Sequence, residues 1–263
     1  MAASTESAKR LEGRVAVVTG ASSGIGEAIA EALAAEGAAV ALAARRAEKL
    51  ADAVARIEAA GGRAVAVATD VTKRDDVKRL VATAEEALGP VDIMVNNAGC
   101  MYFTMMRNVH EDEWERTVDV NIKGVLNGVG AVLPGMLERG RGHIITTSSD
   151  AGRRVFPALA VYCASKHFVE VMSEGLRREV VGTGIKVTTI QPGDVGSTEL
   201  VMKNSDAEAA EKMGVQIGKP VGEGFSDMQL LHVRDVANAV VYAATAPPHV
   251  AINEVLIEPR DQE

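Results

Sequence analysis

The sequence RVAVVTGASSGIGEAIAEALAAEG, residues 14–37, decides the fold. An apolar run rich in valine is followed at once by a turn of glycines, and then by a segment of helical period. In that segment Ile29, Leu33 and Ala34 fall on one stripe, and Gly37 can end the helix as its C-cap. A strand that leads directly into a helix is the first unit of an alternating α/β fold.

The same alternation continues along the chain. Further runs rich in Val and Ile are nearly continuously apolar, which is typical of strands that are buried on both faces. The seven predicted strands are RVAVVTG, AAVALAAR, RAVAVATDV, VDIMVNNAG, GHIITTSS, IKVTTIQPG and NEVLIEP. The sequence therefore predicts one α/β domain over residues 1–263, with residues 1–10 flexible. Its doubly wound (Rossmann) parallel sheet of about seven strands carries helices on both faces, and ligands bind at the carboxyl ends of the strands.

Composition excludes several classes of function. A hydrophobic content of 47% in 263 residues is enough for a full core. The net charge of −8 and the aromatic content of 3% disfavour nucleic acid as a partner. Residues 1–14 lack the apolar run of a secretory signal, and no run approaches the ~20 apolar residues of a membrane span. We therefore expect a cytoplasmic protein without a membrane segment. The two cysteines and five histidines have no ligand spacing, which predicts no metal site.

The glycine turn after the first strand is a candidate phosphate site. Gly20, Gly24 and Gly26 have the spacing G-x-x-x-G-x-G, which differs from the commoner dinucleotide fingerprint. Glycines let the backbone approach a pyrophosphate, and a helix N-terminus supplies amide donors. Tight strand-to-helix turns also use glycine for geometry alone. The predicted cofactor contacts in this turn are Gly20, Ser22, Ser23, Gly24, Ile25 and Gly26.

Arginines follow the second strand, at the position that faces the adenosine ribose in dinucleotide folds. An acid there would bind the ribose 2′-hydroxyl, whereas a base favours a 2′-phosphate. Arg45 and Arg46 stand there, although arginine is unfavourable near a helix N-terminus. A charge-assisted hydrogen bond of about 1.5–3 kcal/mol from Arg45 would favour NADP over NAD by roughly 10- to 150-fold. We predict NADP(H), with NAD as the alternative.

Polar residues also follow the third and fourth strands. Asp70 and Val71 could flank the adenine, and the NNAG turn at residues 96–99 combines side-chain amides with a small turn. Each motif alone is more often a simple turn. The predicted cofactor contacts of the NNAG turn are Asn97, Ala98 and Gly99.

The stretch AVYCASKHF, residues 160–168, carries a phenol and an ammonium. Tyr162 and Lys166 are four positions apart and would share one helix face, which could be a reaction site or plain surface. Ser149 ends the fifth strand, 13 residues before Tyr162, where serines usually cap helices. The irregular region at about residues 193–229 is long enough to be a substrate lid.

Together these motifs resemble the short-chain dehydrogenase/reductase family from about residue 11 to 260. The matching stretches are TGASSGIG (19–26), NNAG (96–99), NIKG with Asn121, Ser149, YCASK (162–166) and PGDVGST (192–198). The tail VVYAATAPPHVAINEVLIEP is similar to the branch that contains clavulanate dehydrogenase and NADP-dependent 3-hydroxy acid (serine) dehydrogenases.

The resemblance implies an NADP(H)-dependent oxidoreductase that reversibly transfers a hydride between the nicotinamide and a ketone, an aldehyde or a secondary alcohol. Tyr162 would be the general acid and base, Ser149 would bind the substrate oxygen, and Asn121 would hold a water that relays protons through Lys166. Lys166 would also grip the nicotinamide ribose. A cation about 4–5 Å from the phenolate contributes roughly 3–4 kcal/mol, enough to lower a tyrosine pKa by 2–3 units. We therefore expect Lys166 to make Tyr162 more acidic.

The resemblance also implies cofactor contacts and a partner. Pro192, Gly193, Val195 and Ser197 would contact the cofactor, although Thr198 beside Ser197 leaves the residue that matches the family's threonine open. The family favours a homotetramer that packs through helices beginning near Glu111 and Val161. An NAD-linked secondary-alcohol dehydrogenase is an alternative. A cofactor-binding sensor without turnover is disfavoured because all four catalytic groups are present.

The predicted substrate pocket has a mixed wall. Asp150, directly after the catalytic serine, could contact a polar or cationic substrate, but we expect it to face solvent. The predicted wall consists of Cys100, Met101, Tyr102, Asp150, Val155, Phe156 and the lid after Pro192.

Overall fold

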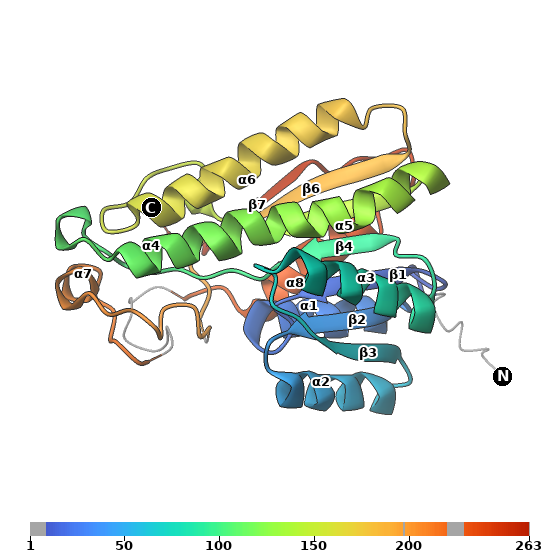
Figure 1. The fold of residues 1–263 in the computed structure, drawn as a ribbon, viewed down its shortest axis with the longest axis horizontal. Coiled ribbons are helices and arrows are strands. Elements are labelled where there is room, and N and C mark those ends of the chain that lie inside the picture. The colour runs from blue at the N-terminus through green and yellow to red at the C-terminus, as the bar shows by residue number, and fades with distance from the viewer. Residues whose placement is uncertain (1–8, 197, 220–228, 263) are drawn as a thin grey trace.

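The centre of the molecule is one sheet of seven strands. The computed structural model describes residues 9–196, 198–219 and 229–262. The strand order is β3-β2-β1-β4-β5-β6-β7, and every pair of neighbours is parallel (Figure 1). The strands are β1 (Val15–Thr19), β2 (Ala39–Ala44), β3 (Arg63–Ala68), β4 (Ile93–Asn96), β5 (Gly142–Thr147), β6 (Ile185–Pro192) and β7 (Glu254–Ile257). Each lies within one predicted apolar run, so the predicted fold is confirmed.

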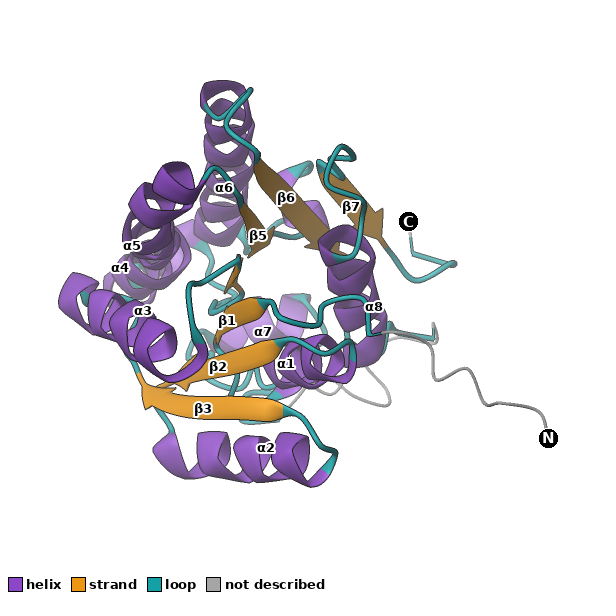
Figure 2. Ribbon diagram, turned by 90° about the vertical axis from the view of Figure 1, so that its right-hand side faces the viewer, coloured by secondary structure: helices purple, strands orange, loops and turns teal. Residues whose placement is uncertain are grey.

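Helices cover both faces of the sheet (Figure 2). One face carries α1 (Gly24–Ala35), α2 (Ala47–Ala59) and α8 (Val233–Ala244). The other carries α3 (Arg74–Leu88), α5 (Gly124–Arg139) and α6 (Ala160–Glu179). A helix α4 (Glu111–Val118) runs through a π-helical segment, Asp119–Lys123, directly into α5. The short helices are η1 (Met106–Asn108), η3 (Asp150–Gly152) and α7 (Ala207–Lys212).

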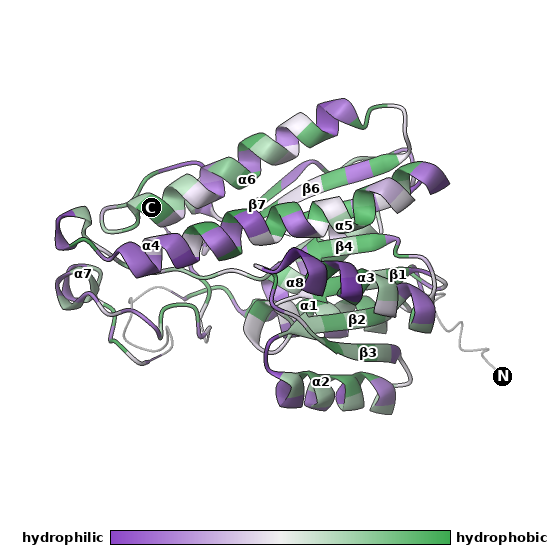
Figure 3. Cartoon of the chain, viewed as in Figure 1, coloured by the Kyte–Doolittle hydropathy of each residue, from purple (hydrophilic) through white to green (hydrophobic). Residues whose placement is uncertain are grey.

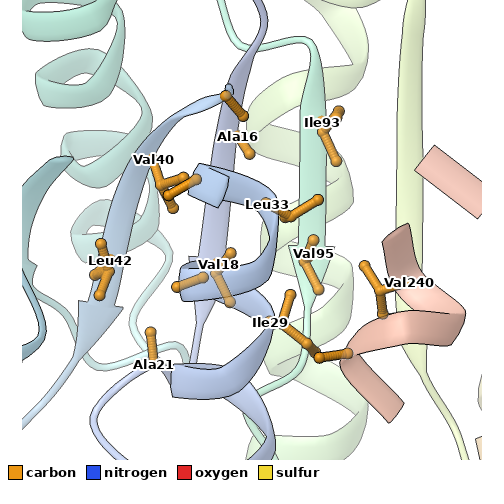
Figure 4. Packing of buried hydrophobic residues seen from close by; sticks show 14 of the residues in the cluster. Ala16, Val18, Ala21, Ile29, Leu33, Val40, Leu42, Ile93, Val95 and Val240 are labelled. Carbon is orange, nitrogen blue, oxygen red and sulfur yellow. The ribbon is translucent and has the colours of Figure 1, made fainter. Parts of the chain in front are cut away.

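The core consists of two apolar layers, one on each side of the sheet. On one side Ile29 and Leu33 of α1 pack with Val240 of α8 against β1, β2 and β4 (Figure 4). On the other side the layer includes Leu80 of α3 and Met136 of α5. Because both faces are covered, all residues of β1, β2 and β4 are buried without alternation. Hydropathy follows this plan, with the central strands mostly apolar and the outer helices mixed (Figure 3).

The strand order explains where a ligand can bind. The chain runs outward from β1 to β3 and then returns to place β4 on the other side of β1. The strand order thus reverses between β1 and β4. The connections that leave these two strands run in opposite directions, which opens a crevice at their carboxyl ends. Beyond these ends lie α7 and the C-terminal end of the chain, at the left of Figure 1.

The long helix at residues 111–139 has an apolar character that calls for an explanation. Among the described residues it is the one helix that by length and composition could cross a membrane. Of its most apolar window, 44% is buried, and α5 contributes Val132 and Met136 to the core beside the sheet. A core helix meets the same criterion, so this observation is weak support for a membrane span.

Candidate active site

Two adjoining cavities lie at the carboxyl ends of the strands. The larger cavity has a volume of about 550 Å³ and is lined by the glycine turn and by the ends of β2, β3 and β4. The smaller cavity has a volume of about 240 Å³ and is lined by Ser149, Tyr162 and Lys166. The two share Ile25, Gly99, Cys100, Thr198 and Leu200 as lining residues. A molecule bound in one can therefore meet a molecule bound in the other.

The glycine turn forms the floor of the larger cavity. Gly20 and Gly24 have positive φ angles of 69° and 59°, which glycine adopts without strain. A Cβ at Gly26 would lie 2.3 Å from the Gly20 carbonyl oxygen, so only glycine lets the turn close this tightly. A Cβ at Gly24 would meet no atom within 4 Å. All six predicted residues of this turn line the larger cavity.

Arg46 occupies a polar corner of the larger cavity. Its guanidinium donates to the hydroxyls of Ser22 at 3.0 Å and Ser23 at 2.7 Å, and it pairs with Glu199 at 2.8 Å. Arg45 also lines the cavity, but its side chain makes no hydrogen bond or salt bridge with the described residues. No acid follows β2, and two guanidinium groups with two hydroxyls suit a phosphate better than a ribose hydroxyl. The sequence did not reveal Glu199, which lies 153 positions from Arg46.

The remaining predicted cofactor contacts lie at the ends of β3 and β4. Asp70, Val71, Asn97, Ala98 and Gly99 all line the larger cavity. Burial alone would raise the pKa of Asp70, but hydrogen bonds from the Thr72 hydroxyl and backbone N–H outweigh it and lower that pKa. The Asn97 side chain donates to the Thr19 carbonyl at 3.0 Å, and this bond fixes the NNAG turn to the end of β1.

The structure brings Tyr162 and Lys166 together in the smaller cavity. Both are buried on α6, and the Lys166 Nζ lies 5.7 Å from the centre of the Tyr162 ring. The ammonium donates to the Thr147 carbonyl at the end of β5, at 2.9 Å. Burial lowers the pKa of Lys166 to about 8, because an ammonium loses its hydration there.

The Tyr162 phenol is less acidic than expected. Burial raises its pKa above the usual range, the charge of Asp150 raises it further, and a hydrogen bond with Ser149 opposes both. The expectation that Tyr162 is more acidic than an ordinary tyrosine is wrong for the chain alone, because burial outweighs the effects that lower its pKa. The ammonium is bonded to Thr147, and its own lowered pKa reduces the charge that it can present.

Ser149 follows β5 and caps η3. Its hydroxyl oxygen accepts from the Ala151 N–H at 3.2 Å, and its proton goes to Asp150 Oδ1 at 2.9 Å. Asp150 is only 6% exposed, and its Oδ2 accepts from Gln262 Nε2 at 2.9 Å. The expectation that Asp150 faces solvent is therefore wrong. Gln262, 112 positions later in the chain, covers it.

Asn121 lies in the π-helical segment, a rare feature that is frequent at functional sites. Its amide oxygen accepts from Cys100 N at 2.9 Å, and its amide nitrogen donates to Cys100 O at 2.9 Å and to Ser165 Oγ at 3.1 Å. The side chain thus ties the loop after β4 to α6. No hydrogen bond joins Asn121 to Lys166 in the described part of the chain.

The lid region is attached to the loop after β4. Asn204 Oδ1 accepts from Phe103 N at 2.7 Å, and Asp206 both caps α7 and accepts from Met105 N at 2.9 Å. Sequence reasoning gave no sign of these contacts, which span 101 positions.

The remaining predicted residues are distributed between the two cavities and the surface. Pro192, Gly193 and Val195 line the smaller cavity, as do Cys100, Met101, Asp150 and Phe156. Tyr102 lines the larger cavity instead. Val155 lines neither and is 70% exposed, because its side chain points away from the site. Ser197 and the lid residues 220–228 lie outside the described residues, whereas Thr198 lines both cavities.

This geometry agrees with what similar proteins show. A family model of the short chain dehydrogenases matches residues 14–209, most of the chain. The chain belongs to the short-chain dehydrogenase family.

Two relatives show the range of the family. This short-chain dehydrogenase is 55% identical over 252 residues to glycine betaine reductase ATRR of Emericella nidulans. The alignment covers 96% of this chain and 19% of that relative, so the chain spans about a fifth of the relative's length. It is 43% identical over 254 residues to an uncharacterized oxidoreductase of Listeria innocua, covering 96% of this chain and 98% of the relative.

Solved structures are similar over nearly the whole chain. The closed form of a serine dehydrogenase complexed with NADP+ has a TM-score of 0.84 at 33% identity, covering 95% of this chain and 96% of the other. An alcohol dehydrogenase of the archaeon Thermococcus sibiricus, complexed with 5-hydroxy-NADP, has a TM-score of 0.81 at 28% identity, covering 95% and 98%. The predicted family and its serine dehydrogenase-like branch are confirmed. This short-chain dehydrogenase is an oxidoreductase of a family that binds nicotinamide cofactors.

Proposed function

We propose that this short-chain dehydrogenase is an NADP(H)-dependent oxidoreductase that interconverts a ketone or aldehyde with an alcohol. The observation that carries this proposal is the meeting of Ser149, Tyr162 and Lys166 in one cavity that opens into a second cavity with phosphate donors. Solved structures of similar proteins that hold NADP+ or 5-hydroxy-NADP support the choice of cofactor.

The residues of the larger cavity fit this cofactor. The open space at Gly24 and the amide groups of the α1 N-terminus suit a pyrophosphate. Arg46, with Ser22 and Ser23, would hold the 2′-phosphate, and Arg45 would add a second charge. When bound, NADPH supplies the hydride that reduces the carbonyl carbon.

Tyr162 is suited to deliver the proton. Its raised pKa keeps the phenol protonated over the whole physiological range, so that a proton is always present at Oη for the substrate oxygen. Once that proton has left, the positive charge of Lys166 stabilises the tyrosinate. The reduction then adds one hydride to carbon and one proton to oxygen, and an alcohol results.

Ser149 supplies a second donor to the same oxygen. A serine hydroxyl has a single proton, which in this structure is bonded to Asp150. Substrate binding therefore requires this hydroxyl to rotate from Asp150 toward the carbonyl. Removing such a donor costs about 2.7–4 kcal/mol in the transition state.

The substrate panel should include small polar carbonyl compounds. Similar proteins are named serine dehydrogenase and glycine betaine reductase, so trimethylammonium aldehydes belong in it, and hydroxy acids should be assayed with NADP+ in the direction of oxidation. We expect NADPH consumption with at least one carbonyl compound. Tyr162→Phe should lower kcat by about 10²–10⁴-fold while NADPH binding is kept. Near-native turnover by Tyr162→Phe would exclude this mechanism.

Two alternatives have distinct outcomes. A larger kcat/KM with NADH than with NADPH would identify an NAD-linked alcohol dehydrogenase. Tight NADPH binding without hydride transfer to any carbonyl compound would identify a sensor.

We also propose a homotetramer. Leu126 and Leu137 of α5 and Val171 of α6 are large apolar side chains that remain exposed, on the helices through which the family resemblance implies packing. Sedimentation equilibrium measures the number of subunits directly. The cytoplasmic location of the protein stays a prediction.

A further inference from the structure

The smaller cavity has an unbalanced charge. Two carboxylates line it, Asp150 after β5 and Asp194 after β6. Among the described residues that line it, Lys166 is the one cationic side chain, and its ammonium is bonded to Thr147 beside the Tyr162 ring. Apart from the catalytic groups, the wall is therefore negatively charged.

The two carboxylates differ in how they are bound. Asp150 accepts hydrogen bonds from Ser149, Ala151 N and Gln262. The Asp194 carboxylate makes no hydrogen bond or salt bridge with any residue that the structure describes, although its backbone N–H donates to Gln262 Oε1 at 3.0 Å. Burial raises the pKa of Asp194, and the charge of Asp150 raises it further. A cation beside Asp194 would offset both effects.

Gln262 holds the two acidic loops together without neutralising them. One end of its amide donates to Asp150 Oδ2, and the other accepts from Asp194 N. The contact is close, since a Cβ at Gly193 would lie 2.2 Å from Gln262 Oε1. The Asp150 carboxylate and the backbone of Asp194 are therefore held next to each other in the wall of the cavity.

The nearest arginine does not balance this charge. Arg154 pairs with Glu258, lies 3.8 Å from Asp150 Oδ2 and covers the Phe156 ring at 5.8 Å. It does not line the smaller cavity. Among the described residues, Arg154 is thus shared between the carboxylates of Asp150 and Glu258, and its charge offsets that of Asp194 only in part.

The rest of the wall is mostly apolar. The large apolar lining residues include Phe103, Phe156, Leu159, Leu200, Val201 and Met213. A bare ammonium would lose its hydration against such a surface, whereas alkyl groups on the nitrogen would pack against it. A volume of about 240 Å³, part of which must hold the reacting carbonyl, limits the substrate to a small molecule.

We propose that the preferred substrates are small carbonyl compounds that carry an alkylammonium group, and that Asp194 binds this cation. The inference deepens the proposed function and rests on it, because Ser149 and Tyr162 must bind the carbonyl in the same cavity. The cation selects the substrate and takes no part in the transfer of hydride and proton.

The test uses two aldehydes of the same shape. Trimethylammonioacetaldehyde and tert-butylacetaldehyde differ in a single atom, nitrogen in place of carbon, and hence in one positive charge. We compare their kcat/KM values with NADPH in the wild-type enzyme and in Asp194→Asn. The ratio of charged to neutral aldehyde should fall by about tenfold or more in Asp194→Asn. Because the intrinsic reactivities of the two aldehydes cancel between the enzymes, the change in ratio reports recognition alone.

A matched control and a second measurement keep the test decisive. Asp52→Asn removes the same charge from an exposed site on α2 and should leave the ratio unchanged. Tetramethylammonium should compete with the neutral aldehyde in the wild-type enzyme, a measurement that does not depend on the folding of any variant. An unchanged ratio in folded Asp194→Asn, or no competition by tetramethylammonium, would overturn this inference and leave the proposed function standing. If no carbonyl compound consumes NADPH, the proposed function itself fails.

Discussion

The two cavities meet at the same strand ends, yet they are built in different ways. The larger cavity is made mainly of turns that directly follow β1 to β4, where it presents Arg45 and Arg46, and the lid region adds Glu199 and its neighbours. The smaller cavity combines strand ends with the lid and with Gln262, and it presents Asp150 and Asp194. Local turns supply most of the lining of the proposed cofactor site, whereas the proposed substrate site depends more on contacts between distant parts of the chain.

The largest expected effect concerns Lys166 in the smaller cavity. Its pKa of about 8 means that the ammonium is charged below that pH and neutral above it, whereas the raised pKa of Tyr162 keeps the phenol protonated. The kcat/KM for carbonyl reduction should therefore be level below pH 8 and fall about tenfold per pH unit above it. In Lys166→Met the kcat/KM should be about 10²–10⁴-fold lower than in the wild-type enzyme, and its pH profile should show no fall that begins near pH 8. If Lys166→Met keeps the wild-type pH profile, another group titrates there.

The next effect concerns cofactor choice in the larger cavity. Arg46→Ala should reduce the preference for NADPH over NADH by roughly 10- to 150-fold, because a charge-assisted hydrogen bond is lost. Arg45→Ala should have a smaller effect, since Arg46 is the residue bonded to Ser22 and Ser23. Arg56→Ala, on α2 outside the cavity, is the control. The measurement is the ratio of kcat/KM for the two cofactors, and a larger effect of Arg45 would reverse the assignment.

A smaller effect concerns the attachment of the lid, which should influence the smaller cavity more than the larger one. Asn204→Ala leaves the Phe103 N–H without its acceptor, which weakens the attachment of the lid. The KM for the carbonyl compound should rise by about 5- to 10-fold, while the Kd of NADPH stays within about twofold. Gln216→Ala, at an exposed lid position whose side chain makes no hydrogen bond with the described residues, is the control. A change in the Kd of NADPH equal to that in KM would show that the lid serves both cavities.

The smallest effect concerns glycine at two helices. Gly24→Ala should lower the free energy of unfolding by about 1 kcal/mol, because φ is +59° even though the space is open. Gly175→Ala in the middle of α6 also meets open space, without a positive φ, and should raise it by up to about 1 kcal/mol. Chemical denaturation of both variants measures the difference, and equal changes of one sign would contradict it.

The sequence predicts the larger cavity better than the smaller one. The apolar runs predicted all seven strands, and the glycine and NNAG turns line the larger cavity, because each depends on neighbouring residues. The adjacent arginines were recognised as a pair, but the sequence could not show that Arg46 is the one that reaches Ser22 and Ser23. A side-chain direction of this kind is fixed by packing.

The substrate end was predicted less well. Asp150 was expected in solvent because nothing near it in the sequence indicates that Gln262 covers it. Asp194 and the lid contact of Asn204 were missed for the same reason. The pKa of Tyr162 was expected to fall because of one nearby cation, but burial is the larger effect. Burial depends on the whole fold, and no spacing of residues shows it.

All strands are parallel, and both cavities lie at the carboxyl ends of the strands. The turns at the amino ends therefore lie away from the proposed site. The turns there include Gly61 before β3 and Gly182 before β6, which both face open space. Exposed turns of this kind tolerate inserted residues. They are suitable attachment points for a linker, a fused partner or a solid support, with the entrance for substrate turned away from the anchor.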